Sequence, residues 1–433
     1  MRLLDDKVSG VELIALVLVG AIMLAPFSCW RLGEDMAKPM VVWMFGKADD
    51  FRPLRRVALQ WEKEIGKTRL EIVHVPHGNV YMQKLLPALQ ANAAPDALFL
   101  HWSMVSQVAA KGALEPLDQL IERDQYDLDD LFPGSTSPYT IDQQLYAFPF
   151  RGSTMVLFYN KDMFDAAGIE YPNDEWTWDD YLRAAQKLTI VKDGFNVQVG
   201  CEPEETSSWI YSAGGDYASD DLSELYFSDP RTLQALQFFV DLRNKYKVTL
   251  RDVNPGSDRP MKIDEFENGL LAMKISGPWE LERYQFIKQF RWGVALFPKG
   301  PAGRHTRYAG TGFGVWSGSS HKEQAWDFVK YMCSVETAQA LASSATDVPA
   351  RRSVAYSKEF LNPNYSWDMS VFVRALEPEY NTLHVFPRTP LWLEFRQLFG
   401  EHYDEVLLDG KDLKSSMELL ERRIRGILRE RGS

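Results

Sequence analysis

The chain has 433 residues, of which 45% are hydrophobic, and a formal net charge of -12 at pH 7. This length exceeds one comfortable hydrophobic core, so we expect two domains. The acidic balance and the lack of a basic stripe argue against a nucleic-acid groove. The three cysteines show no CxxC spacing, so neither a disulfide framework nor a zinc site is indicated.

Residues 1–37 are predicted to be an export segment or a membrane anchor. An uninterrupted apolar run, Leu13 to Ala25, follows a short segment that holds Arg2 and Lys7, a pattern typical of signal sequences. Thirteen residues fit a signal h-region better than a full membrane span. A retained anchor, a removed signal and an atypical lipidated Cys29 remain open.

Strand and helix patterns alternate after this segment. Apolar runs predict three strands, at 40–45, 70–75 and 96–102. Apolar residues at helical spacing follow each strand, at 54–65, 81–91 and 104–111. This alternation predicts an α/β fold with a parallel or mixed sheet, and ligands of such sheets gather where strands end and the loops to helices begin.

A Pro-Phe-Arg-Gly bend at 149–152 is interpreted as a crossing between lobes. Thr177 and Asp180 then stand at capping-box spacing at the start of a helix. Further helices are expected at 231–246, 261–268, 322–334, 391–408 and 413–429.

The stretch Gly277-Pro278-Trp279 places a large aromatic residue at a corner between a strand and a helix. Pro278 suits the first turn of a helix, and Glu280 and Glu282 favour the positive end of the helix dipole. From position alone, Trp279 either fills the core or faces a crevice, where it would meet a flat apolar ligand face.

Five sequence motifs occur in the same order, and at about the same spacing, as the corresponding motifs of one protein family. They are "YNKDMFDAAGI", "TWDDYLRAAQKLT", "FENGLLAMKISGPW", "YAGTGFGVWSGSSHKEQAWDFVKYM" and "DVPARRSV". From about Val41 to Arg429 the chain resembles the extracellular solute-binding proteins of ABC importers, specifically the maltose-binding-protein-like, oligosaccharide-binding family. The N-terminal export segment agrees independently with this resemblance.

The resemblance implies an α/β, two-lobed periplasmic-binding-protein fold of type II, with a ligand cleft between hinged lobes. We expect lobe one at 38–150 plus 312–350 and lobe two at 151–311 plus 351–433. It also implies an exported protein that binds a mono- or oligosaccharide without chemistry and delivers it to the membrane subunits of an ABC permease. No cofactor, metal or nucleic acid is expected, and the N-terminal segment would associate the protein with the membrane.

Sugar recognition needs aromatic faces for the apolar C–H face of a pyranose and polar side chains for its hydroxyl groups. The resemblance assigns ligand stacking to Trp279. Trp209 and Trp392 are further aromatic candidates, and Lys47 is a candidate for binding hydroxyl groups. Two weaker cleft candidates lie near hinge segments of the family, Thr311 and Arg351.

Two loops depart from the family pattern. Where sugar binders often carry an acidic residue after the third strand, this chain offers His101, Trp102 and Ser103. The acidic residue after the first crossing is replaced by Arg151 and Ser153. The loss of two acidic partners and the gain of an arginine argue against maltodextrin itself and leave an acidic or differently substituted saccharide open.

Two other function classes remain open. A glycoside hydrolase also combines aromatic residues with two carboxylates, and adjacent pairs such as Asp179-Asp180 and Asp220-Asp221 supply carboxylates. An anchored sensor would bind the same ligand to signal rather than to import it. His74 and His77 are interpreted as structural or loop histidines rather than as a metal site.

Overall fold

The computed structural model describes residues 38–66, 68–76, 78–192, 195–203, 205–249, 264–343, 347–362 and 364–431. The chain divides into two units, Met1–Pro39 and Met40–Ser433, and the fold described below is that of the second. The predicted export segment, 1–37, lies outside the described residues. None of the helices in the described part of the chain has the length and apolar character needed to cross a membrane.

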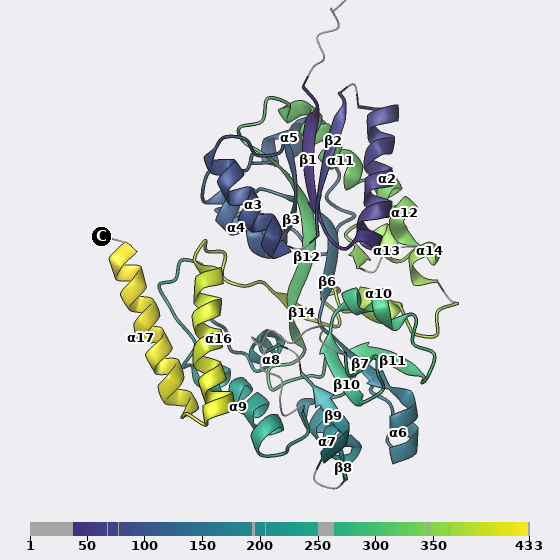
Figure 1. Cartoon of the computed structure of the whole chain (residues 1–433), viewed down its shortest axis with the longest axis vertical. Helices are drawn as coiled ribbons and strands as arrows, with labels where there is room; N and C mark the ends of the chain where they lie inside the picture. The colour runs from purple at the N-terminus through teal and green to yellow at the C-terminus, as the bar shows by residue number, and fades with distance from the viewer. Residues whose placement is uncertain are drawn as a thin grey trace, which may run out of the picture. The chain divides into compact units, whose positions relative to one another are not determined.

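The first sheet contains the three predicted N-terminal strands. Its spatial order is β13 (Val348–Pro349), β6 (Phe148–Thr154), β12 (His305–Val315), β3 (Ala97–His101), β1 (Met40–Phe45) and β2 (Leu70–Val75), and β14 (Thr382–His384) also pairs with β12. β1 runs parallel to β2 and β3, whereas β12 runs antiparallel to β3 and β6. The predicted alternation is confirmed by α2 (Ala48–Glu64), α3 (Gly78–Gln90) and α4 (Trp102–Ala109), which follow the first three strands (Figure 1).

The second sheet is formed by segments from the middle of the chain. Its order is β11 (Trp292–Leu296), β7 (Val156–Asn160), β10 (Leu271–Ser276), β9 (Phe195–Glu202) and β8 (Ile190–Lys192). A separate hairpin pairs β4 (Thr140–Ile141) with β5 (Gln144–Leu145). Because β6 belongs to the first sheet and β7 to the second, the chain passes between the sheets at Met155.

Helices occupy most of the remaining chain. They are α5 (Asp118–Asp124), α6 (Lys161–Ala167), α7 (Trp178–Leu188), α8 (Ser207–Ser212), α9 (Pro230–Asn244), α10 (Leu281–Tyr284), α11 (Lys322–Met332), α12 (Val335–Ala342), α13 (Arg352–Ala355), α14 (Lys358–Leu361), α15 (Ser370–Arg374), α16 (Trp392–Asp409) and α17 (Leu413–Arg431), with the 3-10 turns η1 (Ser137–Tyr139) and η2 (Pro278–Glu280). The predicted capping box is confirmed at α7, where the Thr177 hydroxyl accepts the N–H of Asp180 and the Asp180 carboxylate accepts the N–H of Thr177. Figure 1 shows α16 and α17 side by side, next to α9.

The helix expected at 261–268 is wrong in its described part. Residues 264–268 form turns, in which the Asp264 carboxylate accepts the backbone N–H of Glu267 at 2.9 Å. Gly269 follows with a φ of +69°, in the left-handed region. The apolar spacing of this stretch is too short to outweigh the turn signal of Asn268-Gly269.

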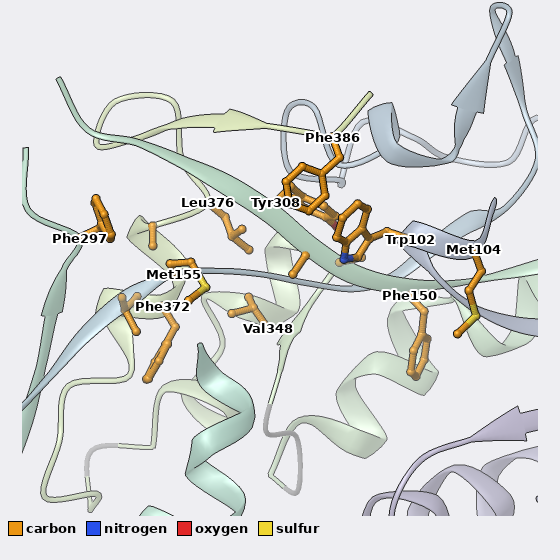
Figure 2. Packing of buried hydrophobic residues seen from close by; sticks show 14 of the residues in the cluster. Trp102, Met104, Phe150, Met155, Phe297, Tyr308, Val348, Phe372, Leu376 and Phe386 are labelled. Atoms are coloured by element: carbon orange, nitrogen blue, oxygen red, sulfur yellow. The ribbon is translucent and has the colours of Figure 1, made fainter. Parts of the chain in front are cut away.

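Buried side chains continue along β6 and β12, the strands that lead from one sheet toward the other. Figure 2 shows Phe150, Met155 and Tyr308 in this region and the rings of Trp102 and Phe386 close together, with their centroids 5.1 Å apart. Met155 and Tyr308 are almost completely buried. The connection between the sheets is therefore a packed core rather than a loose linker.

Candidate functional site

A cavity of about 1210 Å³ is lined by elements of both sheets. Residues of β3, β6 and β12 come from the first sheet, and residues of β9 and β10 come from the second. The turn η2 and helix α16 add aromatic and charged side chains. Long charged and aromatic residues therefore meet in one space, although they come from segments as far apart in the chain as Phe45 and Asp404.

A row of polar residues crosses the first sheet at this cavity. His101 of β3 pairs with Thr311 of β12, and Thr311 pairs with Arg151 of β6. Because alternate residues of a strand share one face, Ser153 joins Arg151, and Arg307 joins Thr311. All five line the cavity. The structure thus brings together four residues predicted from the sequence and adds Arg307.

The His101 imidazole is held neutral. Burial, together with the guanidinium groups of Arg307 and Arg396, lowers its pKa to about 3. Its Nδ1 accepts the backbone N–H of Ser103 at 3.4 Å and lies 2.7 Å from the Ser103 hydroxyl oxygen. This contact caps α4 and assigns the ring proton to Nε2, which is left to donate. Ser103 does not line the cavity itself and instead positions His101.

Aromatic rings form a continuous part of the cavity lining. Trp102 packs on Phe386 with centroids 5.1 Å apart, Phe386 stacks on Trp392 at 4.7 Å, and Tyr217 meets Trp392 edge-on at 5.1 Å. Trp102 and Trp392 are only 6% and 5% exposed, and neither indole N–H has an acceptor among the described residues. The two predicted tryptophans therefore lie at the cavity with donors that remain unsatisfied.

Trp279 lies at the cavity as well, half-buried on η2. The indole ring folds back over Gly277. A side chain at position 277 would clash with it, because a Cβ there would lie 2.1 Å from Cζ3 of the ring. The Arg307 guanidinium carbon lies 5.8 Å from the ring centroid, and Arg307 Nε lies 3.6 Å from the Glu205 carboxylate. The interpretation of Trp279 as a residue sealed in the core is therefore wrong.

Another part of the lining is an ion network of Asp264, Lys274, Glu280 and Arg283, to which the buried Tyr284 adds its hydroxyl group. Lys274 Nζ lies 2.8 Å from the Asp264 carboxylate and 3.0 Å from that of Glu280. Arg283 contacts both carboxylates, and the Tyr284 hydroxyl donates to Asp264 at 3.0 Å. Burial opposes ionisation of Asp264, but Lys274 and Arg283 outweigh it, so the pKa of Asp264 lies below its usual value. The sequence analysis did not identify this network.

Trp209 does not line the cavity, which corrects its prediction as a cleft residue. It is fully buried in a cluster with Trp178, Tyr181 and Phe297, whose ring centroids lie 4.9 to 5.2 Å away. Its indole N–H donates to the Pro203 carbonyl at 3.4 Å. The position next to a glycine turn was correct, but the short helix α8 is buried on all sides and turns this ring into the core.

Two cationic candidates also lie away from the lining. Arg351 is 3% exposed and donates to the carbonyl groups of Cys333 and Asp127, both at 2.8 Å, so its contacts are structural. Lys47 is exposed and forms a 2.5 Å ion pair with Glu282 of α10. Its neighbour Gly46 lines the cavity, so Lys47 lies beside the cavity rather than in it.

Several lining residues were missed by the sequence analysis. Arg307 could have been found, because it alternates with Thr311 along one strand. Arg396 and Phe386 could not, because their place depends on how the C-terminal helices pack. Glu205 and Tyr217 also line the cavity and were not predicted.

The described residues contain no group of three or more His, Cys, Asp or Glu side chains arranged to hold a metal ion. His74 lies 2.7 Å from the Gly46 carbonyl oxygen and stacks on Phe51 with centroids 4.0 Å apart. His77 lies outside the described residues. The contacts of His74 are thus structural.

Comparisons with known proteins agree with this architecture. A family model described as bacterial extracellular solute-binding protein matches residues 60–364. An arabinooligosaccharide-binding protein from Halalkalibacterium halodurans is 24% identical over 405 residues, which cover 90% of this chain and 82% of that protein. An sn-glycerol-3-phosphate-binding periplasmic protein from Pectobacterium atrosepticum is 25% identical over 287 residues, which cover 63% of each chain.

A solved structure is similar over nearly its whole length. It is an ABC substrate-binding protein from Listeria monocytogenes in complex with cycloalternan, with a TM-score of 0.79 and 24% identity. The match covers 90% of this chain and 98% of that one. At this identity the likeness shows the fold alone, and it confirms the predicted two-lobed α/β architecture.

Proposed function

Because the chain belongs to the family of bacterial extracellular solute-binding proteins, we propose that it captures a mono- or oligosaccharide in the cavity and delivers it to an ABC permease. Membership of this family implies an exported protein, in the periplasm or at the cell surface. Retention at the membrane through the N-terminal segment is part of the proposal.

The observation that carries the proposal is the position of Trp279. Its half-buried indole lines the same cavity as the polar row of His101, Thr311 and Arg151. A pyranose has an apolar C–H face that suits an indole ring and hydroxyl groups that suit polar side chains. The cavity, at about 1210 Å³, exceeds the range of about 300 to 1,000 Å³ usual for small-molecule sites and has room for more than one sugar ring.

The proposed mechanism is closure of the two predicted lobes over the ligand. A ligand that contacts both sheets favours the closed form only to the extent that it binds that form more tightly. The ion pair between Lys47 and Glu282 joins the segment after β1 to α10 beside the cavity. We propose that it adds to closure and that the closed form docks on the permease. The lobe boundaries stay a prediction.

We propose no catalytic step in this cavity. A hydrolase needs two carboxyl groups beside the scissile bond, one of them kept protonated, whereas Asp264 and Glu280 are engaged in the ion network and the pKa of Asp264 is lowered. Burial raises the pKa of Asp404, which also lines the cavity, so hydrolysis has to be measured directly. Incubation of the protein with an oligosaccharide panel should release no reducing ends. Loss of uptake when the gene is deleted would separate import from sensing.

A thermal-shift screen of the full chain against mono- and oligosaccharides tests the proposal. A ligand at 100 times its dissociation constant should add about 2.7 kcal/mol to the free energy of unfolding. Trp279→Ala should remove the shift while the apo protein still melts cooperatively. A panel in which no saccharide raises the melting temperature would contradict the proposed function.

A further inference from the structure

We infer that the cavity selects a ligand carrying an anionic group, a carboxylate or a phosphate, and that Arg307 and Arg396 hold this group. The inference rests on the proposed function, because it assigns the ligand class of the same cavity. It depends on five residues that we call the donor wall: His101, Trp102, Arg307, Trp392 and Arg396.

The donor wall is assembled from three separate elements. His101 and Trp102 stand at the junction of β3 and α4, and Arg307 comes from β12. Trp392 and Arg396 are four residues apart in α16 and so lie on the same side of that helix. All five line the cavity. The rings of His101 and Trp102 lie 5.2 Å apart, and Phe386 links Trp102 to Trp392 with centroid distances of 5.1 and 4.7 Å, so the end of β3 and the start of α16 meet at one side of the cavity.

The two arginines of the donor wall have few ionic partners among the described residues. Arg396 is exposed and has no hydrogen bond or ion pair with another described residue. Arg307 is paired with Glu205 at the long distance of 3.6 Å. That same carboxylate also accepts the backbone N–H groups of Ser207 at 2.8 Å and Ser208 at 3.1 Å. The Glu205 carboxylate is therefore shared between Arg307 and two backbone N–H groups.

Three other carboxylates of the cavity add little negative charge near Arg396. Asp264 and Glu280 belong to the ion network. Burial raises the pKa of Asp404, although the charge of Arg243 lowers it. These acids do not neutralise Arg396, so an incoming anion has a guanidinium available to it.

The donor wall also contains N–H donors without an acceptor, although neighbouring side chains shield the two indole nitrogens from solvent in this form. The indole N–H groups of Trp102 and Trp392 have no partner among the described residues, although both side chains are more than nine-tenths buried. The ring proton of His101 is assigned to Nε2, because Nδ1 accepts from Ser103. Buried donors without acceptors cost free energy. A carboxylate or phosphate carries only acceptor oxygens and forms strong bidentate contacts with arginine.

Calorimetric titration of the full chain with matched ligand pairs tests the inference. One arm compares galacturonate oligosaccharides with neutral galactose oligosaccharides of equal length, and the other compares glucose 6-phosphate and sn-glycerol 3-phosphate with glucose and glycerol. The charged member of at least one pair should bind about tenfold or more tightly than its neutral partner. This preference should shrink as salt is added, because ions screen the exposed Arg396. The arm that responds distinguishes a carboxylate from a phosphate.

Variants of Arg396 test whether this residue causes the preference for the charged ligand. Arg396→Gln should weaken the charged ligand by about 10- to 100-fold and leave its neutral partner unchanged. Arg396→Lys should retain part of the preference because it keeps the charge. Arg422→Gln, which removes an exposed arginine from α17, is the matched control and should bind like the wild type.

Each outcome decides one of the two proposals. If neutral saccharides bind as tightly as charged ones, or if Arg396→Gln binds the charged ligand like the wild type, the anionic ligand class is wrong and saccharide binding stands. If neither charged nor neutral ligands of the panel bind, both proposals fail. Unchanged melting of apo Arg396→Gln shows that a loss of binding is not a loss of folding.

Discussion

The ion network and the donor wall line the same cavity but differ in how their polar groups are satisfied. In the ion network, Lys274 lies within 3.0 Å of two carboxylates, and both carboxylates also contact Arg283. In the donor wall, two indole N–H groups lack acceptors and Arg396 has no ion pair among the described residues. The difference indicates that the first stabilises the fold, whereas the second is arranged for a ligand.

Breaking the ion network should have the largest effect on stability. Lys274→Met leaves the buried carboxylates of Asp264 and Glu280 to share Arg283, and we expect the free energy of unfolding to fall by about 3–5 kcal/mol. Urea denaturation measures this loss. The exposed Lys288→Met is the matched control and should stay within about 0.5 kcal/mol of the wild type. Equal unfolding free energies for both variants would contradict a structural role for the network.

The stability effects of replacing Trp209 and Trp279 distinguish a core residue from a cavity residue. Trp209→Ala removes a fully buried ring and should cost about 3–5 kcal/mol of stability. Trp279→Ala removes a half-buried ring at the cavity and should cost about 1 kcal/mol. The same denaturation experiment compares the two variants of the apo protein. A loss for Trp279→Ala as large as that for Trp209→Ala would place both rings in the core.

The donor wall should make stability depend on pH. Because the pKa of His101 is lowered from 6.5 to about 3 in the folded protein, the unfolded chain binds more protons between these values. Stability is thus fully present above pH 6.5 and falls as the pH drops below it. His384, with a pKa lowered to about 4 by burial and by His305, adds to the same slope.

Denaturation at a series of pH values measures this slope. His101→Gln should flatten it, most clearly between pH 6.5 and pH 5, where most carboxylates stay ionised in both states. An identical slope in the wild type and the variant would show that His101 titrates normally.

The ion pair of Lys47 with Glu282 should have the smallest effect, because exposed pairs contribute about 1 kcal/mol or less. Lys47→Ala should speed ligand release by no more than about fivefold, as measured by stopped-flow fluorescence. Lys63→Ala, an exposed change in α2, is the control. Release accelerated as strongly as by Trp279→Ala would make Lys47 a direct ligand contact instead.

Much of the fold could be predicted from the sequence, because strand and helix periodicity are local. The alternating strands from β1 to β3 and the capping box of α7 are both confirmed. The turns at 264–268 were missed, since the apolar spacing was followed in place of the local turn signal of Asn268-Gly269.

Residues of the candidate site were predicted only where the local sequence pattern identifies the end of a strand or a crossing between the lobes. His101 and Arg151 stand at a strand end and at a crossing strand, and the structure places both at the cavity. Arg396 could not be predicted, because α16 reaches the cavity only through tertiary packing, whereas Arg307 was overlooked although it alternates with Thr311 along β12. Trp209 was misplaced, because a motif fixes the position of a residue along the chain but not the direction of its ring.

The most direct test of the central claim is calorimetric titration of the wild type and of Trp279→Ala with the saccharide that gives the largest thermal shift. If the cavity is the binding site, the dissociation constant should rise by at least about tenfold in the variant, because truncating a central aromatic contact typically costs 2 kcal/mol or more. The same dissociation constant for both proteins would contradict the account, since the ligand would then bind somewhere that this indole does not reach.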